Sequence, residues 1–137
     1  MGVEVHNFLG ISKWILNHFI INNLPVKIKD KLLAAGREFI NTDDIGGHGI
    51  QTIGASVIAT KRKYDGVIQI YPFTCMPEII AQNVLIEVQR KYKIPVMTLI
   101  VDEMTGEEGY KTRLEAFVDM LEMRRRKTAL FEKQLII

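Results

Sequence analysis

The sequence contains only one cysteine among its 137 residues, which excludes an internal disulfide framework. Its formal net charge of +2 is too small to indicate binding to nucleic acid. Its apolar runs fall far short of the roughly 20 residues that a membrane span requires. It also shows no basic start followed by an apolar segment, so no signal peptide is predicted. We therefore expect no membrane span, no nucleic-acid partner and a cytoplasmic location.

What the sequence does contain is typical of a folded globular domain. Hydrophobic residues make up 47% of the chain and charged residues 25%, which is ordinary for such proteins. A chain of 137 residues is long enough for one domain with a substantial core. No internal repeat or low-complexity segment divides it.

The first half of the chain predicts three helices. Apolar residues recur at helical spacing at Phe8, Ile11, Trp14, Ile15 and Phe19, then at Ile28, Leu32, Ala35, Gly36 and Phe39, and then at Ile50, Ile53, Gly54, Val57 and Ile58. A loop rich in turn residues (41–49) separates the second helix from the third. A basic run (61–63) ends the third helix, as the helix dipole favours.

The second half predicts a strand, a helix, a strand and a last long helix. Residues 66–71 and 94–101 are nearly continuous apolar runs, which suit parallel strands buried on both faces. The helix between them has an apolar face formed by Ala81, Val84, Leu85, Val88 and Tyr92. The last helix has one formed by Tyr110, Leu114, Phe117, Val118 and Leu121.

A sheet of two strands is thin for an independent domain. Residues 2–5 or the tail (129–137) could add a third strand. Otherwise the chain is one part of something larger, either a fragment or a subunit whose partner completes the sheet. Apolar surface left by a thin sheet would then be buried in a homo-oligomer or against a partner.

The only cysteine, Cys75, lies in "YPFTCMPE" (71–78), where a predicted strand leads into a predicted helix. Pro77 and Glu78 are typical of the first turn of a helix. A thiol there faces the positive end of the helix dipole, which favours the thiolate that binds soft metals or attacks electrophiles. The alternative is a small buried cysteine that only fills space.

A second loop is expected beside this turn. In a parallel α/β sheet the ligand crevice lies at the carboxyl ends of the strands, and the helix after Gly46, Gly47, His48 and Gly49 should begin at that edge. The glycines permit a tight turn whose N–H groups suit an anion. The alternative is a flexible connection.

Three more residues are candidates at the same edge. Asp102 and Glu103 follow the second predicted strand, and Thr74 precedes the cysteine. The two acidic residues are either acid/base groups or metal ligands, or they cap the next turn. The basic run 124–127 is predicted to solvate the end of the last helix, with contact to an acidic partner or a phosphate as the alternative.

Several strings in this chain resemble one protein family. "GGHG", "YDGVIQIYPFTCMPE", "IPVMTLIVDE", "TGEEGY" and "TRLEAFVDMLEMRRR" follow one another in that family's order and spacing. The family is that of the 2-hydroxyacyl-CoA dehydratase-related proteins, also called CoA-substrate-specific enzyme activase-related proteins, and the similarity is to their C-terminal region. It covers roughly residues 44–126, whereas residues 1–40 carry little of it.

The resemblance implies a fold, a cofactor and a role for the cysteine. Members of the family are anaerobic iron–sulfur proteins that dehydrate 2-hydroxyacyl-CoA or transfer low-potential electrons. The implied fold is α/β, a Rossmann-like three-layer lobe with a small parallel sheet, incomplete in this chain. It would span 43–137, with 1–42 as an N-terminal helical segment of the same compact unit. Cys75 would be one ligand of a [4Fe–4S] cluster at the carboxyl edge, and an acyl-CoA is an implied ligand.

The chain also departs from the family pattern. A cubane needs about four ligands, usually thiolates, and this chain has one cysteine. An upstream lobe, a partner subunit or another copy would have to supply the others. We therefore expect the chain alone to hold no cluster and to be inactive as an enzyme. Nothing in it resembles the ATP-binding activator module of the family.

Two other interpretations stay open at this point. One is a non-catalytic scaffold or oligomerisation domain of the same fold, in which Cys75 only packs. The other is a mononuclear zinc site formed by Cys75, His48 and either Asp102 or Glu103, which are residue types that zinc accepts.

Overall fold

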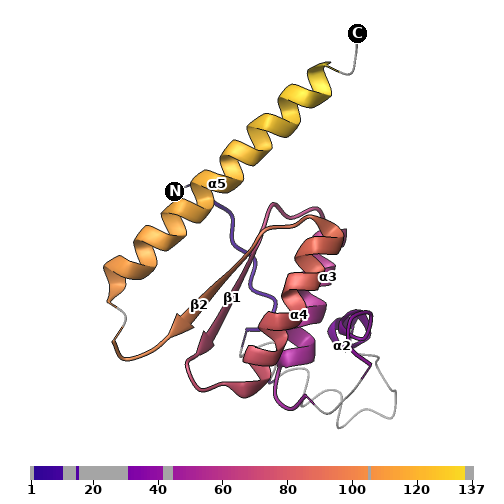
Figure 1. Cartoon of the computed structure of the whole chain (residues 1–137), viewed down its shortest axis with the longest axis vertical. Helices are drawn as coiled ribbons and strands as arrows, with labels where there is room; N and C mark the ends of the chain where they lie inside the picture. The colour runs from indigo at the N-terminus through magenta and orange to yellow at the C-terminus, as the bar shows by residue number, and fades with distance from the viewer. Residues whose placement is uncertain (1, 11–14, 16–30, 42–44, 105, 135–137) are drawn as a thin grey trace.

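The computed structural model of the chain is drawn in Figure 1 and describes residues 2–10, 15, 31–41, 45–104 and 106–134. Its elements follow one another as α2 (Lys31–Gly36), α3 (Gly49–Lys61), β1 (Val67–Pro72), α4 (Met76–Tyr92), β2 (Val96–Val101) and α5 (Glu107–Gln134). This mixture of helices with a small sheet agrees with the predicted α/β class.

The two strands are parallel and in register from one end to the other. Val67 pairs with Val96 at the amino end, and Pro72 pairs with Val101 at the carboxyl end. The prediction of two parallel strands joined by a crossover helix is therefore confirmed. Both strands end at the same edge of the sheet, so the loops that follow them leave side by side.

α3 and α4 pack on one face of the sheet and form the core with it (Figure 1). The most deeply buried apolar side chains belong to the stripes that the sequence indicates: Ile53, Val57, Ala81, Leu85 and Val88. A helix with such a stripe is stabilised mainly by burying it against its neighbours. Truncation of a buried leucine such as Leu85 to alanine typically costs about 2–5 kcal/mol.

α2 packs closely on α3 because both helices have a glycine where they meet. A Cβ at Gly54 would collide with the carbonyl oxygen of Leu32, and one at Gly36 would lie 2.8 Å from Cγ2 of Ile50. The missing side chains let the two backbones approach directly. The predicted apolar positions Gly36 and Gly54 are therefore contact points between helices.

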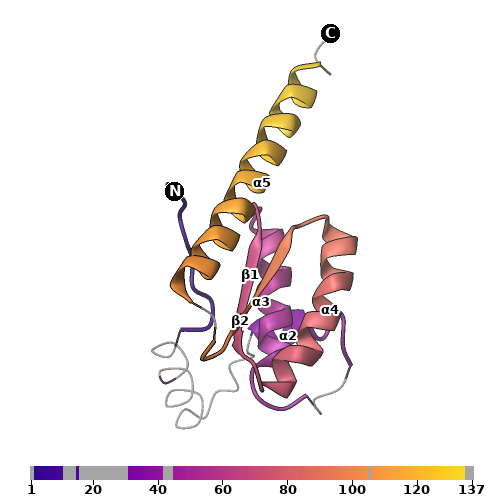
Figure 2. The same ribbon diagram turned by 60° about the vertical axis from the view of Figure 1, so that its left-hand side comes forward.

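α5 lies on the opposite side of the sheet from α3 and α4, as two views agree (Figure 1 and Figure 2). Its Phe117 and Leu121 lie over Gly66, where an added Cβ would be 3.0–3.1 Å from their side chains. Near its start, Tyr110 Oη donates to the carbonyl of Ile100 and Arg113 Nη2 to that of Thr98, both at 3.0 Å. The N-terminal part of α5 thus follows β2.

The two carbonyls that α5 contacts lie on the outer edge of β2. The N–H groups of Val67 and Phe73 donate to the carbonyls of Pro95 and Val101, and carbonyl direction alternates along a strand. Thr98 and Ile100 therefore direct their carbonyls away from β1. Side chains of α5 occupy this outer edge.

α5 covers only part of its face of the sheet. Leu99 of β2 is 3% exposed, whereas Ile70, its partner across the ladder, is 63% exposed and Ile68 is 38% exposed. Among the described residues, no backbone hydrogen bond outside the β1–β2 ladder reaches Ile68 or Ile70. The β1 side of the sheet therefore keeps both an open edge and an apolar face.

Several predicted details are wrong. Residues 2–5 have no regular structure and 129–134 are helical, so neither adds a strand. β2 begins at Val96 instead of residue 94, because Pro95 has no N–H for the ladder. α5 begins at Glu107, before the apolar pattern starts, because acidic residues favour a helix N-terminus. The basic run 124–127 lies within α5 and not at its end.

Other predictions fall largely outside the described residues. Most of the first predicted helix does so. Of its two described apolar positions, Phe8 lies in a bend and Ile15 is helical. The second predicted helix is described only from residue 31 onward, where α2 spans Lys31–Gly36. Within the part of the chain that the structure describes, no helix combines the length and apolar character of a membrane span.

Candidate functional site at the carboxyl edge of the sheet

Cys75 is the residue that caps the start of α4. Its N–H donates to the carbonyl of Pro72 at 2.9 Å, and its own carbonyl accepts N–H groups of Glu78 and Ile79 at 3.1 Å. The backbone of this turn is therefore fixed on both sides of the cysteine. The thiol is half-buried and makes no capping hydrogen bond. Pro77 is the second residue of α4, one position later than predicted.

The glycine loop packs directly against this turn. A Cβ at Gly49 would lie 2.7 Å from the carbonyl oxygen of Pro77, and one at Gly47 would lie 3.2 Å from its ring. Gly47 also has a φ of +62°, which glycine adopts at little cost. The predicted meeting of this loop with the cysteine-bearing turn is confirmed. Gly49 and Gly47 thus allow the loop to pack against Pro77, and Gly47 also permits the turn in the backbone.

The remaining residues of the glycine loop face solvent. Gly46 has open space where a Cβ would be added. His48 is exposed, and its Nδ1 lies 2.7 Å from Oε1 of Gln51, one turn into α3. The imidazole is therefore engaged at the start of its own helix.

The loop after β2 reaches the same edge. Phe73 N–H donates to the carbonyl of Val101, the last residue of β2, at 3.1 Å, which extends the ladder one residue past the end of β1. Asp102 Oδ1 accepts the N–H of Met104 at 3.0 Å, so this carboxylate caps the next turn, which is one of the two predicted alternatives. Glu103 and Thr74 are exposed on this edge.

These side chains do not assemble into a complete metal site. Among the described residues, no three His, Cys, Asp or Glu side chains are grouped so that they could hold one ion. The interpretation of Cys75, His48 and Asp102 or Glu103 as a zinc site is therefore wrong for this structure, although all four residues come from loops of one edge.

A buried polar network behind this edge was not predicted. Glu78 is 8% exposed, and its carboxylate accepts hydrogen bonds from Thr52 Oγ1 at 2.8 Å and Gln69 Nε2 at 2.9 Å. Gln69 Nε2 also donates to the backbone carbonyl of Glu78 at 2.9 Å, and Gln69 Oε1 accepts from Thr98 at 3.1 Å. The network joins α3, β1, α4 and β2, and it fixes the first turn of α4 directly after Cys75.

The sequence does contain a sign of this network. Gln69 is the one polar residue inside an otherwise apolar strand, and Thr52 lies on the apolar face of α3. A polar side chain at an inward position must find a hydrogen-bond partner, and acidic residues near a helix start are available partners. No buried side-chain nitrogen or oxygen of the described residues lacks a partner.

The side chains on either side of Cys75 are apolar and exposed. Phe73 is 65% exposed and Met76 is 64% exposed. In β1, which leads into this turn, Ile68 and Ile70 are exposed too, as described above. We call Ile68, Ile70, Phe73 and Met76 the β1 apolar residues. They are large apolar side chains in contact with water, in the same segment as the thiol.

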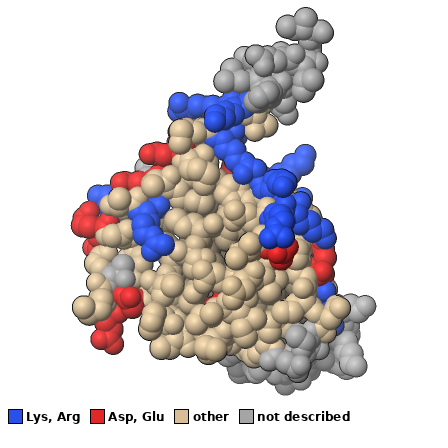
Figure 3. Space-filling view, in the orientation of Figure 1, with Lys and Arg blue, Asp and Glu red and all other residues tan. Residues whose placement is uncertain are grey.

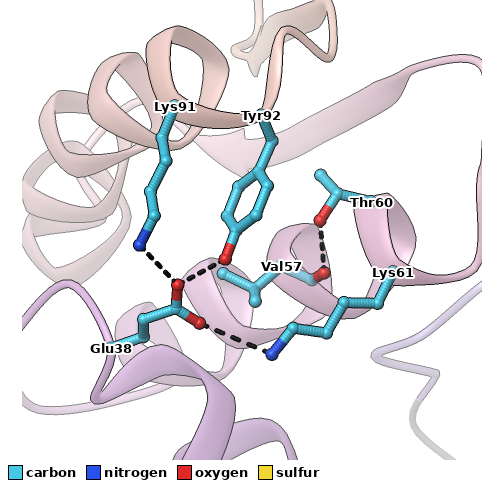
Figure 4. A network of polar contacts seen from close by, with 6 residues as sticks. All are labelled: Glu38, Val57, Thr60, Lys61, Lys91 and Tyr92. Atoms are coloured by element: carbon cyan, nitrogen blue, oxygen red, sulfur yellow. Dashed lines mark hydrogen bonds and ion pairs between the residues drawn. The ribbon is translucent and has the colours of Figure 1, made fainter.

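A second polar network lies between the turn after α2 and the C-terminal ends of α3 and α4 (Figure 4). Lys91 Nζ and Tyr92 Oη both donate to Oε1 of Glu38, with Lys91 at 2.7 Å, and Lys61 Nζ lies 3.5 Å from Oε2. Hydrogen bonds from Lys91 and then Tyr92 lower the pKa of Glu38 to about 2 from an ordinary value of 4.5. The bond to Glu38 likewise raises the pKa of Lys91 and of Tyr92. This network joins the turn after α2 to the last turns of α3 and α4.

Comparisons with protein-family models, with curated proteins and with solved structures found no match for this chain.

Proposed function

We propose that this chain is the C-terminal, Rossmann-like lobe of an iron–sulfur protein related to the 2-hydroxyacyl-CoA dehydratases. Cys75 supplies one ligand of a [4Fe–4S] cluster at the carboxyl edge of the sheet. The setting of this cysteine carries the proposal: the only thiol of the chain is half-buried at a helix start, in a turn held by the glycine loop. The sequence strings that resemble the family include the same turn and the loops beside it.

The chain by itself does not fit a complete cluster. A cubane needs about four ligands, whereas the sequence has one cysteine and the described residues contain no group of three metal-binding side chains. In this proposal the other ligands come from another chain or from another region of a longer protein. The chain alone is then inactive, and we assign no step of a dehydration or electron transfer to its residues.

The apolar surface around the cysteine supports a shared site. Along the chain the β1 apolar residues lead toward Cys75 and flank it, and a partner that covers them would bury large apolar side chains now exposed to water. A lobe that packs there would exclude water from the thiol and bring its own ligands to it. The acyl-CoA thioester implied by the resemblance would bind to the complete assembly.

The ligand role of Cys75 can be tested on the assembled protein. The chain is purified under anoxic conditions with the partners that accompany it, and iron and acid-labile sulfide are measured per chain. Cys75→Ser should lower both by more than half, because a cluster that loses one of its ligands is retained poorly. Gln89→Ser, an exposed residue near the other end of α4, is the control and should leave both unchanged. Equal iron and sulfide in Cys75→Ser and wild type would refute the ligand role.

A second candidate function is a scaffold or oligomerisation domain of the same fold without a cluster. The open edge of β1 favours it, because unpaired N–H and C=O groups of an edge strand readily accept another strand. Ile70→Lys would place a charge on the exposed face beside this edge and should shift an oligomer toward monomers. Light scattering would detect the shift. A wild-type chain that is monomeric at high concentration and binds no partner would exclude the scaffold function.

A further inference from the structure

Three basic runs that are far apart in the sequence meet at the amino edge of the sheet, opposite Cys75. One ends α3, one ends α4 and one lies in α5. They contain ten of the chain's 18 Lys and Arg residues: Lys61, Arg62, Lys63, Arg90, Lys91, Lys93, Arg124, Arg125, Arg126 and Lys127. Figure 3 shows Lys and Arg gathered on the upper part of the molecule, around the base of the projecting helix.

Helix dipoles explain some of these cations but not all of them. The C-terminal ends of α3 and α4 lie at this edge, and cations there offset the partial negative charge of the last turns. Arg124 and Arg125 are different, because α5 continues to Gln134 and they lie in its interior. The dipole effect is confined to the last turn of a helix, so these two arginines need another explanation.

A cavity of about 240 Å³ lies among these runs. Its walls come from the last turns of α3 and α4, from the residues just before each strand, and from one side of α5. They are formed by Thr60, Tyr64, Asp65, Tyr92, Lys93, Ile94, Pro95, Leu121, Arg124, Arg125 and Thr128. Three cations and one carboxylate therefore line the cavity, which gives it a net charge of +2.

Most cations near this cavity have partners, whereas two that line it form no ion pair with any residue that the structure describes. Lys61 and Lys91 pair with Glu38, while Arg90 pairs with Glu87 and Arg126 with Glu122. Arg124 donates to the backbone carbonyl of Lys93. Among the described residues, Lys93 and Arg125 form no ion pair.

We propose that this cavity binds a small phosphorylated molecule, with its phosphate held by Arg125 and Lys93. A guanidinium matches the paired oxygens of a phosphate, and an ammonium adds a compact point charge. The apolar wall of Ile94, Pro95 and Leu121 suits the uncharged part of such a molecule. This site lies at the edge opposite Cys75, and it does not depend on whether a cluster is bound there.

The proposal is tested by calorimetric titration of the purified chain, with any accompanying partner, using inorganic pyrophosphate as the probe. We expect saturable binding with one site per chain in 50 mM salt. Arg125→Glu and Lys93→Glu should each weaken binding at least tenfold. Arg125→Lys should weaken it several-fold, because lysine keeps the charge but lacks the planar guanidinium that binds two phosphate oxygens at once. Lys111→Glu makes the same charge change near the start of α5 and should leave the affinity within twofold.

Three results would overturn the proposal. One is binding that does not saturate. The second is an equal loss of affinity in Lys111→Glu and Arg125→Glu, which would indicate a response to net charge alone. The third is a single-stranded oligonucleotide that binds more tightly than pyrophosphate and is released steeply by salt, which would assign the basic runs to a polyanion instead of the cavity. Circular dichroism of each variant should confirm that the fold is intact.

Discussion

The carboxyl and amino edges of the sheet each depend on one glutamate, in opposite settings. Glu78, behind the carboxyl edge, is buried and bonded to the neutral side chains of Thr52 and Gln69. Glu38, at the amino edge, lies at the surface between the cations Lys91 and Lys61. The first depends on complete hydrogen bonding in a site closed to water, whereas the second depends on charge and is open to protons and salt. The same residue type therefore fixes packing at one edge and responds to solution conditions at the other.

The largest effect is expected at the buried glutamate. Glu78→Ala leaves the hydroxyl of Thr52 and the amide of Gln69 buried without their partner, and each such group costs about 1–3 kcal/mol. We expect the free energy of unfolding to fall by about 3 kcal/mol, measured by urea denaturation. Glu87→Ala, on the exposed side of the same helix, is the control and should cost well under about 1 kcal/mol. Equal losses in the two variants would contradict the role assigned to the network.

The glycine loop gives the next largest effect. Gly49→Ala adds a methyl group 2.7 Å from the carbonyl oxygen of Pro77, so the loop or the start of α4 must move. We expect a loss of about 1–3 kcal/mol of unfolding free energy, as overpacking usually costs. Gly46→Ala in the same loop meets open space and should be nearly neutral. If thermal melts rank the two variants the other way, the loop does not pack against the turn as described.

The smallest effect, and the one that depends on pH, is expected at Glu38. Its pKa is lowered to about 2 in the folded protein, so its contribution is complete above the ordinary pKa of 4.5 and disappears as the pH falls toward 2. Glu38→Gln should lower the unfolding free energy at pH 7 by about 1 kcal/mol. Urea denaturation of both proteins should show the difference shrinking between pH 5 and pH 2. A difference that is constant over this range would show that the carboxylate charge has no part in it.

The dependence of stability on salt should also distinguish the two glutamates. Ionic strength screens exposed charges far more than buried hydrogen bonds. In 1 M sodium chloride the cost of Glu38→Gln should fall to about half or less, while the cost of Glu78→Ala should stay within measurement error. Equal salt sensitivity of the two variants would mean that Glu78 is more accessible to solvent than its burial indicates.

The parallel strands, the helices of the second half and the meeting of two loops at one edge could be predicted from sequence. Each depends on local periodicity or on the direction in which parallel strands run. The apolar stripes that contain Ile53 and Leu85 and the glycines near Pro77 were sufficient for this. The same reasoning predicted that the chain's single thiol would lie at a helix start.

The polar networks could not be predicted in the same way. Periodicity treats a polar residue as exposed, and it does not specify which residue Gln69 will contact nine positions later. The bonds of Glu38 to Lys91 and Tyr92 join residues more than 50 positions apart, and only tertiary packing decides such pairs. The cavity at the amino edge has the same origin, because its walls come from α3, α4, α5 and the residues just before the two strands.

The bonds that Tyr110 and Arg113 make to the outer carbonyls of β2 have a consequence for assembly. Within the described part of the chain they leave β1 as the margin to which a further strand can add, so this two-stranded sheet can extend in a single direction. Two copies joined through β1 would present α5 at both ends, and the array would stop at two. A sheet with two open edges could instead add strands at both of them and grow into fibres. The N-terminal turns of this helix thereby restrict how many chains one sheet can recruit.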